Sequence, residues 1–592
     1  MVLKLSSHDP LATLPPEIIL RILDFSPVSV LASLLAVSKA WHQFIDVTHQ
    51  HAIYSSESKT SQPSGTSRDL NSLDQSLSIS KYYQGTSSWK ELCKRQTLLA
   101  RNWAAKSPVC HDTVLQVGND PIWRFRVDLK RRLFISTSHA GGLNVTDMDS
   151  GHIIWRLPST LDRDENAVRP YAHLEYEDGM VVFDREGNAV EVWKTDLEGL
   201  ARGEFRRIAV LNHEYQTRGF QLSYNTLCVV SNEGKGFVYD MAQQPPVMTA
   251  CLDIEHGAVG HLDQNEDTVI YSIGQKGYYA YDKRSGAFLG ALRPTSSTEI
   301  FHICAPLADA DGDTAAEPRP NSAQSSSRPR GKVITPVEII QGALPISDDS
   351  DYIPHEADEW GAGMLDGDLF VGFSRAGRVF VCPDWRTVLR DQFASSTTHG
   401  SLIECESDGS SFDLGGWLAI RHHRLLFEIQ DRVYVVSLGR DNHVKDKTHA
   451  ESASFSILTS SAPQLAVPVS YMTLCDDAIL TTYTTLAWRQ PIPNIPGNHR
   501  GQREENSPLI FPTKAIRILS MAPEISEQAS SDSDETNNRS ESLNLKARSG
   551  PGQPTEQVWQ SHDVSFQMAS LLEDNLPDWE DEEFVSDQEG TE

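Results

Sequence analysis

Residues 180–196, MVVFDREGNAVEVWKTD, contain an apolar strand, a polar turn with glycine, and a second apolar strand that ends near an acidic residue. Such a pattern is typical of a β-hairpin. The same order recurs before and after this stretch along the chain. The other clear examples are residues 133–157, 227–241, 268–292 and 369–389. Beyond residue 114 the sequence therefore predicts a large all-β domain.

The spacing of these segments predicts how the strands associate. The first four recur at about 42 to 47 residues, which is the blade period of a WD-type β-propeller. A blade cannot bury both of its faces alone, so several blades should stack around an axis. Weaker candidates begin at residues 425, 478 and 514. Counting them gives about six to eight blades, with seven preferred.

The resemblance to WD repeats is partial. Tyr239-Asp240 and Tyr281-Asp282 stand where Trp-Asp often stands, and the usual Gly-His pair is absent. The alternative fold is a β-sandwich or two smaller β domains.

The N-terminal region has a helical period instead. Residues 14–54 are LPPEIILRILDFSPVSVLASLLAVSKAWHQFIDVTHQHAIY. Pro15 and Pro16 suit the first turn of a helix, and Glu17 then lies near the positive end of the helix dipole. Apolar residues at helical spacing, with a break before Pro27, predict three short helices. So small a unit buries little surface alone, and we expect it to associate with something else.

These helices resemble the F-box in the order of three motifs, which are Leu14-Pro15-x-Glu17-Ile18, a leucine-rich middle and Val37-Ser38-Lys39-x-Trp41. F-box domains dock on the Skp-type adaptor of cullin-RING ubiquitin ligases, so the resemblance implies such an adaptor as partner. It assigns ten residues to adaptor binding, namely Leu14, Pro15, Glu17, Ile18, Ile22, Leu31, Leu34, Val37, Ser38 and Trp41, and all of these except Glu17 and Ser38 divide between the small core and the interface. The alternative is an ordinary helical hairpin packed on its own domain.

Composition divides the first part of the chain. The F-box is expected at residues 10–54, and residues 55–88, rich in Ser, Thr, Gln and Gly, are expected to be a flexible linker. Residues 89–110 begin with W-K-E-L-C and place Trp89 and Trp103 on one side of a helix. F-box proteins often have a similar helix that joins the box to its recognition domain. A solvated surface helix is the alternative for this segment.

The fold class is therefore a small all-α F-box module followed by a large all-β propeller of about seven blades. The propeller is expected at residues 114–520, with a disordered insertion at about 308–350. Residues 521–592 are expected to form a disordered acidic tail, whose last 22 residues contain no Lys or Arg. This tail either solubilises the chain or carries a short motif that docks on a basic groove.

The net charge of −29 and the pI of about 5.1 argue against nucleic acid as the main partner. The longest apolar stretch is about half of what a membrane span needs, so no membrane association is expected. Eight scattered cysteines without a C-x-x-C pair support neither a disulfide framework nor a zinc finger. We expect a soluble intracellular protein that is cytoplasmic, nuclear or both.

Enzymatic motifs are weak. Residues 149–155, D-S-G-x-x-x-W, resemble one repeat of quinone-dependent dehydrogenase propellers, but one copy is also ordinary turn chemistry. Residues 421–424, R-H-H-R, lack a spaced third metal ligand. The sequence therefore predicts no catalytic residue, no cofactor and no metal site.

Basic side chains offer candidate contacts for a partner. Residues 126–132 and 319–332 are local basic patches, and the second is either a nuclear-import signal or a solvated loop. Arg124, Arg126 and Arg218 are candidates to meet an acidic or phosphorylated peptide, because guanidinium groups pair well with phosphate.

These observations predict the substrate-recognition subunit of an SCF-type E3 ubiquitin ligase, which makes no covalent chemistry itself. The F-box would bind the Skp-type adaptor, and through it cullin and the RING protein, while the propeller would bind an unknown target protein. The alternatives are an F-box propeller scaffold that acts outside a cullin complex, and a quinone-dependent dehydrogenase-like propeller.

Overall fold

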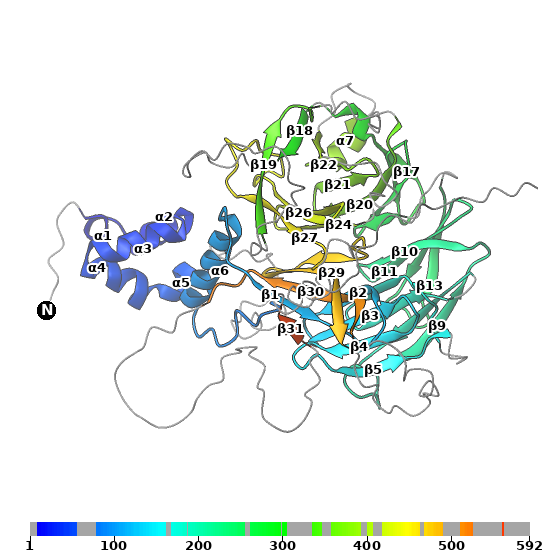
Figure 1. Cartoon of the computed structure of the whole chain (residues 1–592). Helices are drawn as coiled ribbons and strands as arrows, with labels where there is room; N and C mark the ends of the chain where they lie inside the picture. Colours follow the sequence, from blue (N-terminus) through cyan, green and yellow to red (C-terminus); the bar gives the residue numbers. More distant parts are fainter. Residues whose placement is uncertain are drawn as a thin grey trace, which may run out of the picture.

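The computed structural model describes residues 9–55, 78–160, 167–185, 188–254, 261–297, 299–304, 334–345, 357–391, 400–405, 417–461, 467–488, 510–524 and 559–561. Figure 1 shows a helical arm that projects from one side of a large β body. The basic patch at residues 319–332 lies outside the described residues, as do most of the expected linker, insertion and tail.

The helical arm consists of short helices in sequence order. They are α1 (Pro10–Thr13), α2 (Pro16–Phe25), α3 (Val28–Val37), α4 (Lys39–His42), the π-helix η1 (Gln43–Thr48) and α5 (Gln50–Tyr54). Pro16 opens α2, and Ser26 ends it where Pro27 follows. A longer helix, α6 (Trp89–Ala104), then leads into the β body.

The described strands form seven units of four antiparallel strands, which are the blades of a propeller. Blade 1 is β2 (Ile122–Asp128), β3 (Leu133–Ser138), β4 (Leu143–Asp147) and β5 (Ile153–Leu157). Blade 2 is β6 (Leu174–Glu177), β7 (Met180–Asp184), β8 (Ala189–Lys194) and β9 (Arg206–Asn212). Blade 3 is β10 (Thr217–Ser223), β11 (Thr226–Ser231), β12 (Lys235–Asp240) and β13 (Val247–Asp253). Blade 4 is β14 (Leu262–Gln264), β15 (Thr268–Ser272), β16 (Tyr278–Asp282) and β17 (Phe288–Leu292), followed by the 3-10 turn η4 (Pro294–Ser296).

The last three blades are less regular. Blade 5 is β20 (Trp360–Asp366), β21 (Leu369–Ser374), β22 (Arg378–Cys382) and β23 (Ser401–Glu404), with helix α7 (Trp385–Asp391) between β22 and β23. Blade 6 is β24 (Leu418–Arg421), β25 (Arg424–Ile429), β26 (Arg432–Ser437) and β27 (Ser454–Leu458). Blade 7 is β28 (Met472–Leu474), β29 (Ala478–Trp488), β30 (Ile510–Ser520) and β1 (His111–Leu115).

Blade 7 closes the ring with a strand from each end of the domain. β1 pairs antiparallel with β30, and the Arg517 guanidinium donates to Asp112 with Nε 3.0 Å from Oδ1. The segments from residues 478 and 514, counted separately in the sequence as candidate blades, are neighbouring strands of this one sheet. The structure therefore has seven blades, which is the number that the sequence analysis preferred. Counting the two segments as separate blades would give eight.

A hairpin on the outer side joins blades 5 and 6 into one sheet of ten strands. β18 (Glu299–Cys304) pairs parallel with β23, β19 (Ile334–Gln341) pairs antiparallel with β27, and β18 and β19 pair with each other. Consequently the fourth strand of blade 5 is buried along its whole length, whereas that of blade 3 is largely exposed. The hairpin covers edge groups that are open in the regular blades.

The C-terminal region differs from the tail expected at residues 521–592 at two places. Met521 and Ala522 are buried in the cluster that joins α6 to the propeller. β31 (Trp559–Ser561) pairs antiparallel with β1 and adds a fifth strand to blade 7, with Val114 opposite Gln560. The other residues of the expected tail beyond Glu524 lie outside the described residues.

From blade 1 to blade 7 the innermost strand of each blade lies against that of the next, and β2 contacts β29 and β30 where blades 1 and 7 meet, so the innermost strands line the propeller axis. Strands β2, β6, β10, β14, β20, β24 and β28 form this ring. Within the described residues, none of the helices combines the length and apolarity that a membrane crossing requires.

Candidate functional site

The helical arm has a core and an uncovered apolar surface. Ile19, Leu23 and Ile45 are buried in a cluster that continues through α6 into the propeller. On the same helix α2, Ile18 is 49% exposed, Ile22 is 51% exposed and Phe25 is 73% exposed. Exposed apolar side chains in such a row are a usual sign of a protein interface.

The ten residues that the resemblance assigned to adaptor binding differ in how deeply the structure buries them. Leu31 and Trp41 belong to the core, and Leu34 is partly buried against it. Ser38 is structural, because its Oγ accepts a hydrogen bond from Trp41 N at 3.2 Å and caps α4. The remaining six are exposed, namely Leu14, Pro15, Glu17, Ile18, Ile22 and Val37.

The sequence interpretation missed Phe25, the most exposed apolar side chain of this row. Its spacing could have identified it, because positions 18, 22 and 25 follow the i, i+4, i+7 pattern of one helical face. We call Leu14, Ile18, Ile22 and Phe25 the arm face, since they recur at steps of four, four and three residues along and just before α2.

Helix α6 connects the arm to the propeller. Its N-terminus is capped by Ser88, whose Oγ accepts from Glu91 N at 3.2 Å. On the arm side, Lys90 Nζ lies 2.5 Å from Asp46 Oδ2, and Cys93 Sγ donates to the Tyr54 carbonyl at 3.4 Å. The arm is therefore fixed to α6 by an ion pair as well as by apolar contacts.

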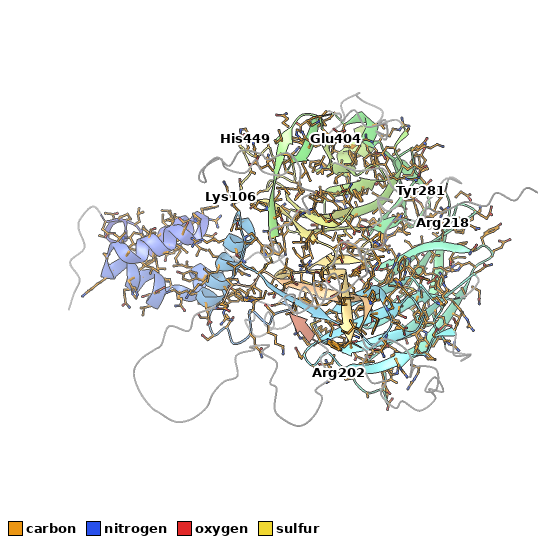
Figure 2. The ribbon with its side chains drawn as sticks, viewed as in Figure 1. Lys106, Arg202, Arg218, Tyr281, Glu404 and His449 are labelled. Atoms are coloured by element: carbon orange, nitrogen blue, oxygen red, sulfur yellow. The ribbon has the colours of Figure 1, made fainter. Side chains whose placement is uncertain are left out.

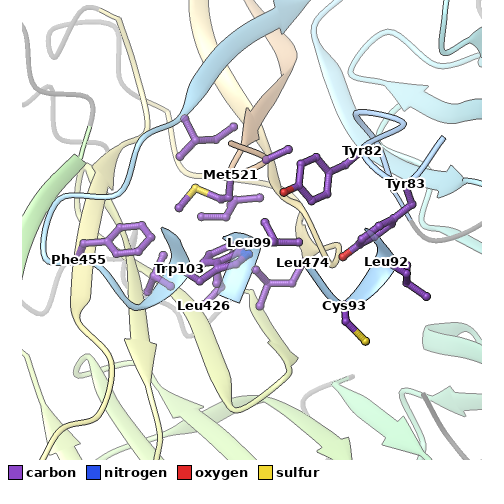
Figure 3. Close-up of a cluster of buried hydrophobic side chains, with 14 of the residues drawn as sticks. Tyr82, Tyr83, Leu92, Cys93, Leu99, Trp103, Leu426, Phe455, Leu474 and Met521 are labelled. Carbon is purple, nitrogen blue, oxygen red and sulfur yellow. The ribbon is translucent and has the colours of Figure 1, made fainter. Parts of the chain in front are cut away.

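The other end of α6 is embedded in blades 6 and 7. Trp103 is 3% exposed, and its Nε1 donates to the Asp476 carbonyl oxygen at 3.0 Å. The Arg424 guanidinium stacks on the Trp103 ring, 4.6 Å from its centroid. Figure 3 shows Trp103 and Leu99 among Leu426, Phe455 and other side chains of the propeller. A single apolar cluster thus runs from the arm to the β body.

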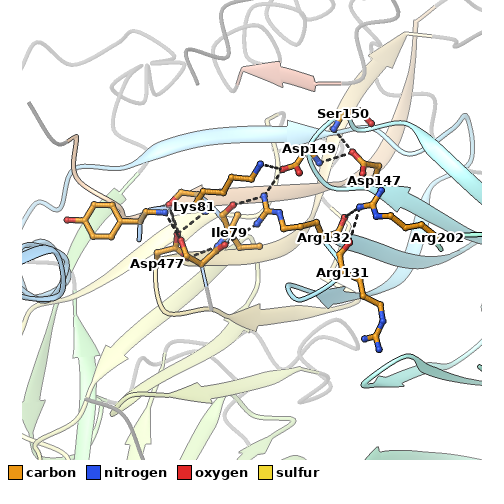
Figure 4. A network of polar contacts seen from close by, with 12 residues as sticks. Ile79, Lys81, Arg131, Arg132, Asp147, Asp149, Ser150, Arg202 and Asp477 are labelled. Atoms are coloured by element: carbon orange, nitrogen blue, oxygen red, sulfur yellow. Dashed lines mark hydrogen bonds and ion pairs between the residues drawn. The ribbon is translucent and has the colours of Figure 1, made fainter. Parts of the chain in front are cut away.

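A second connection comes from residues 78–83, which we call the strap. The buried Asp477 carboxylate accepts four hydrogen bonds from it, from the backbone N–H of Ile79 and Ser80 and from the hydroxyls of Ser78 and Ser80. Arg132 donates to the carbonyl oxygens of Ser78 and Ile79 at 3.0 and 3.1 Å, as Figure 4 shows. We call α6, the strap and their contacts with blades 1, 6 and 7 the joint.

The strap differs from the expected flexible linker at residues 55–88. Within it, Ile79, Tyr82 and Tyr83 are buried, with Tyr82 OH donating to the Arg95 carbonyl oxygen at 3.1 Å. The connecting helix also ends earlier than residue 110, at Ala104, and the first propeller strand begins at His111.

The basic patch at residues 126–132 is neutralised by the protein itself. Arg131 Nε donates to Asp196 at 2.7 Å, and Arg132 Nη2 donates to Asp149 at 2.8 Å. Arg126 pairs with the buried Glu175. These three arginines are consequently occupied by structural contacts.

The two stretches considered for enzymatic chemistry are turns. Asp147 Oδ1 accepts from the backbone N–H of Ser150 at 2.7 Å, which orders the D-S-G turn of blade 1. His422 and His423 both have positive φ and form the tight turn between β24 and β25. Among the described residues, no group of three or more His, Cys, Asp or Glu side chains is arranged to hold a metal ion.

The axis of the propeller carries a set of charged and aromatic side chains at one end. Arg124 stacks on Trp417, 4.3 Å from the ring centroid, and Arg126 stacks on Tyr471 at 4.2 Å. Burial would lower the pKa of Arg126, but the Glu175 carboxylate outweighs it and raises that pKa. Of the three arginines that the sequence named for an acidic peptide, Arg126 therefore already has its anion.

Comparison with known proteins identifies the arm. Residues 11–50 match the family model of the F-box-like domain. A search of curated proteins gives no match.

Several solved structures are similar to this chain at low identity. The computationally designed Ika8 protein is 14% identical, with 62% of this chain and 95% of that chain covered and a TM-score of 0.34. U3-55K is 10% identical, covers 69% and 98%, and has a TM-score of 0.39. The β-propeller domain of Myceliophteria thermophila Cps50 (Swd1) is 10% identical, covers 69% and 98%, and has a TM-score of 0.38.

Proposed function

We propose that this chain is the substrate-recognition subunit of an SCF-type E3 ubiquitin ligase. In this role the arm binds a Skp-type adaptor, and through it cullin and a RING protein, while the propeller binds the target. The observation that carries the proposal is the exposed arm face within the region that matches the F-box-like domain. An F-box-like domain joined to a propeller fits the architecture of a substrate receptor.

The joint supports this role physically. Ubiquitin transfer to a bound target depends on proximity, because tethering replaces a bimolecular encounter by one with a high effective concentration. A target held on the propeller keeps a defined position relative to the adaptor only when the arm does not swing. The Trp103 and Asp477 contacts fix α6 and the strap to the body, and the Lys90–Asp46 ion pair fixes the arm to α6. The subunit itself would supply no covalent chemistry and would act in the cytoplasm, the nucleus or both.

The adaptor contact is tested with the variant I18D/I22D, which places two charges on the arm face. Desolvating such charges in an apolar interface is costly, so adaptor recovered with the chain should fall at least about tenfold. The matched control is F288D, because Phe288 is 54% exposed on β17, in blade 4 of the β body. Equal adaptor recovery with wild type and I18D/I22D would refute the proposal.

Cullin content separates this proposal from a scaffold that acts outside the ligase. Complexes purified through the adaptor should contain cullin as well as the chain. Complexes with adaptor but without cullin would favour the scaffold.

A further inference from the structure

The solvent side of helix α6 carries cations that its buried side does not need. Lys94 and Arg101 are seven residues apart, so they leave the helix on one side, opposite the buried Trp103. Lys106 follows shortly after α6 ends at Ala104, and Figure 2 shows it at that end of the helix. The side chains of Lys94, Arg101 and Lys106 are all exposed, and we call these three residues the basic face.

The basic face differs from the other cations of α6 in having no acidic partner. Lys90 pairs with Asp46, and Arg95 Nη2 lies 2.6 Å from Glu91 Oε1. Within the described part of the chain, the three cations of the basic face form no ion pair. Residues 89–110 contain five Lys or Arg and only one acidic residue, although the whole chain has a net charge of −29. The basic face is therefore a positive surface on a negative protein.

An apolar side chain lies beside these cations. Val109 is 62% exposed. Asn102, in the last turn of α6, holds it there, because Asn102 Nδ2 donates to the Val109 carbonyl oxygen at 2.7 Å and Val109 N donates to Asn102 Oδ1 at 2.8 Å. The surface at the end of α6 thus combines positive charge with an exposed apolar contact, and it fits an anionic segment that also carries apolar side chains.

The C-terminal part of the chain is delivered to this surface. β31 pairs antiparallel with β1, beside which Figure 1 shows it, and Ser561 lies opposite Thr113. The chain therefore leaves β31 toward His111, the end of β1 that follows α6. An extended residue spans up to about 3.3 Å, so residues 562–570 alone can cover about 30 Å, which exceeds the length of about 24 Å of a helix such as α6.

The last 22 residues have the chemistry that the basic face fits. Residues 571–592 contain ten Asp or Glu and no Lys or Arg. Leu576, Trp579 and Phe584 interrupt these acids and can meet an apolar contact such as Val109. Elsewhere many exposed cations already have acids of their own, as Lys447 has in Glu338.

We propose that the basic face is a docking surface for residues 571–592 of the same chain. Attachment through β31 gives this segment a high effective concentration at α6, so individually weak ion pairs can act together. Because the pairs are exposed to solvent, salt screens them and releases the segment. The inference goes beyond the proposed function and does not depend on it, since the contact lies within one chain.

The first test is carbodiimide cross-linking of the full-length chain, which couples lysine amines to nearby carboxylates. An equal mixture of 14N-labelled and 15N-labelled chains is treated at about 0.02 M and about 1 M salt and analysed by mass spectrometry. Lys94 or Lys106 should couple to acids of residues 571–592 within one chain, at least about threefold more at low salt. Absence of this cross-link at low salt would overturn the proposal. Cross-links that join 14N to 15N chains would assign the docked segment to a second copy and overturn it as stated.

The second test reverses the charge of the basic face in the variant K94E/R101E/K106E. Chymotrypsin cleaves after Trp579 and Phe584, and a docked segment is protected from it. For each protein, the cleavage rate at about 0.02 M salt is divided by the rate at about 1 M salt. This ratio should rise about threefold or more in the variant. An unchanged ratio would overturn the proposal.

The matched control is R284E/R386E/K447E, which changes the net charge by the same amount on the propeller. The side chains of Arg284, Arg386 and Lys447 are 87%, 44% and 45% exposed, so their reversal disturbs the fold little. This control should keep the wild-type ratio. A ratio that rises equally in the control would attribute the effect to net charge and refute the site.

A charge swap separates direct pairing from a change in folding. E580K/D581K/E582K alters only the docked segment, should raise the cleavage ratio alone, and replaces the basic-face variant should that protein fail to fold. Combining the two triple substitutions should restore protection, because opposite charges face each other again. An unchanged ratio in the segment variant, or no restoration in the combination, would refute pairing between the segment and the basic face.

Discussion

The two ends of the propeller differ in how completely their buried polar groups are hydrogen-bonded. At the joint, the Asp477 carboxylate accepts four hydrogen bonds from the strap, so both of its oxygens have partners. At the other end, Arg124 has two buried nitrogens without a hydrogen-bond partner. The same device, an arginine on a tryptophan ring, occurs at both ends as Arg424 on Trp103 and Arg124 on Trp417. The Asp477 cluster is hydrogen-bonded throughout, whereas Arg424 at the joint and Arg124 at the other end each keep a buried Nε without a hydrogen-bond partner.

The largest expected effect concerns Trp103, because it connects α6 to the propeller. The W103A variant removes a side chain that is 3% exposed and loses the hydrogen bond to Asp476. Its free energy of unfolding should fall by about 3 to 5 kcal/mol, measured by urea unfolding followed by circular dichroism. The control W488A, at a tryptophan that is 43% exposed, should lose far less. Similar losses in both variants would show that the joint is not a tightly packed contact.

The next effect concerns the strap. The D477A variant leaves the donors of Ser78, Ile79 and Ser80 without their acceptor and should cost about 3 kcal/mol. Hydrogen exchange should then accelerate at residues 78–83 while the blade 3 strands remain protected. The matched control is D267A, because Asp267 occupies the corresponding turn position of blade 4, with a side chain that is 67% exposed. Unchanged exchange of the strap in D477A would contradict the attachment.

The strap also shows where composition misleads. Residues 55–88 have a polar composition on average, but Ser78 and Ser80 are polar because they donate to Asp477, and Ile79 beside them is buried. The partner lies 399 residues away from Ser78 in the sequence, so no local pattern could reveal it. The same holds for β1, whose partner strand comes from the other end of the domain.

The blade period was a better guide, because each regular blade is built from consecutive strands with short turns. It was less useful where the ring closes, because blade 7 takes β1 from the N-terminal side of the domain. In the sequence, β29 and β30 are also far enough apart to be counted as two candidate blades, although they pair in one sheet. For the arm, helical spacing predicted the helix that carries Ile18 and Ile22, and the resemblance to the F-box assigned both residues to a core or an interface. Burial was needed to separate them from Leu31.

A smaller effect at the joint depends on pH. Burial alone would raise the pKa of Asp476, but its contacts with His422 and Arg421 outweigh it and lower that pKa below the usual 3.8. A carboxylate whose pKa is lowered by folding stabilises the protein at pH values above its unfolded-state pKa. This stabilisation is lost as the pH falls through the folded-state pKa.

The free energy of unfolding of wild type should therefore fall more steeply below about pH 4 than that of D476N. At pH 7 the substitution should cost about 1 kcal/mol or less, because the Arg421 and His422 side chains are 39% and 47% exposed. Urea unfolding midpoints between pH 3 and pH 7 measure both quantities. Parallel curves for the two proteins would show that Asp476 contributes no such dependence.

The last two variants compare the two Arg–Trp pairs. In the R424Q variant the joint loses a stacking contact and the hydrogen bond from Nη1 to the His422 carbonyl oxygen, so unfolding should become easier by about 1 to 2 kcal/mol. In R124Q the lost stacking is offset because two buried nitrogens without a hydrogen-bond partner are removed, and the change should stay within about 1 kcal/mol. Urea unfolding of both variants measures the difference. A larger loss in R124Q than in R424Q would mean that the Arg124–Trp417 stack stabilises the fold more than the Arg424–Trp103 stack does.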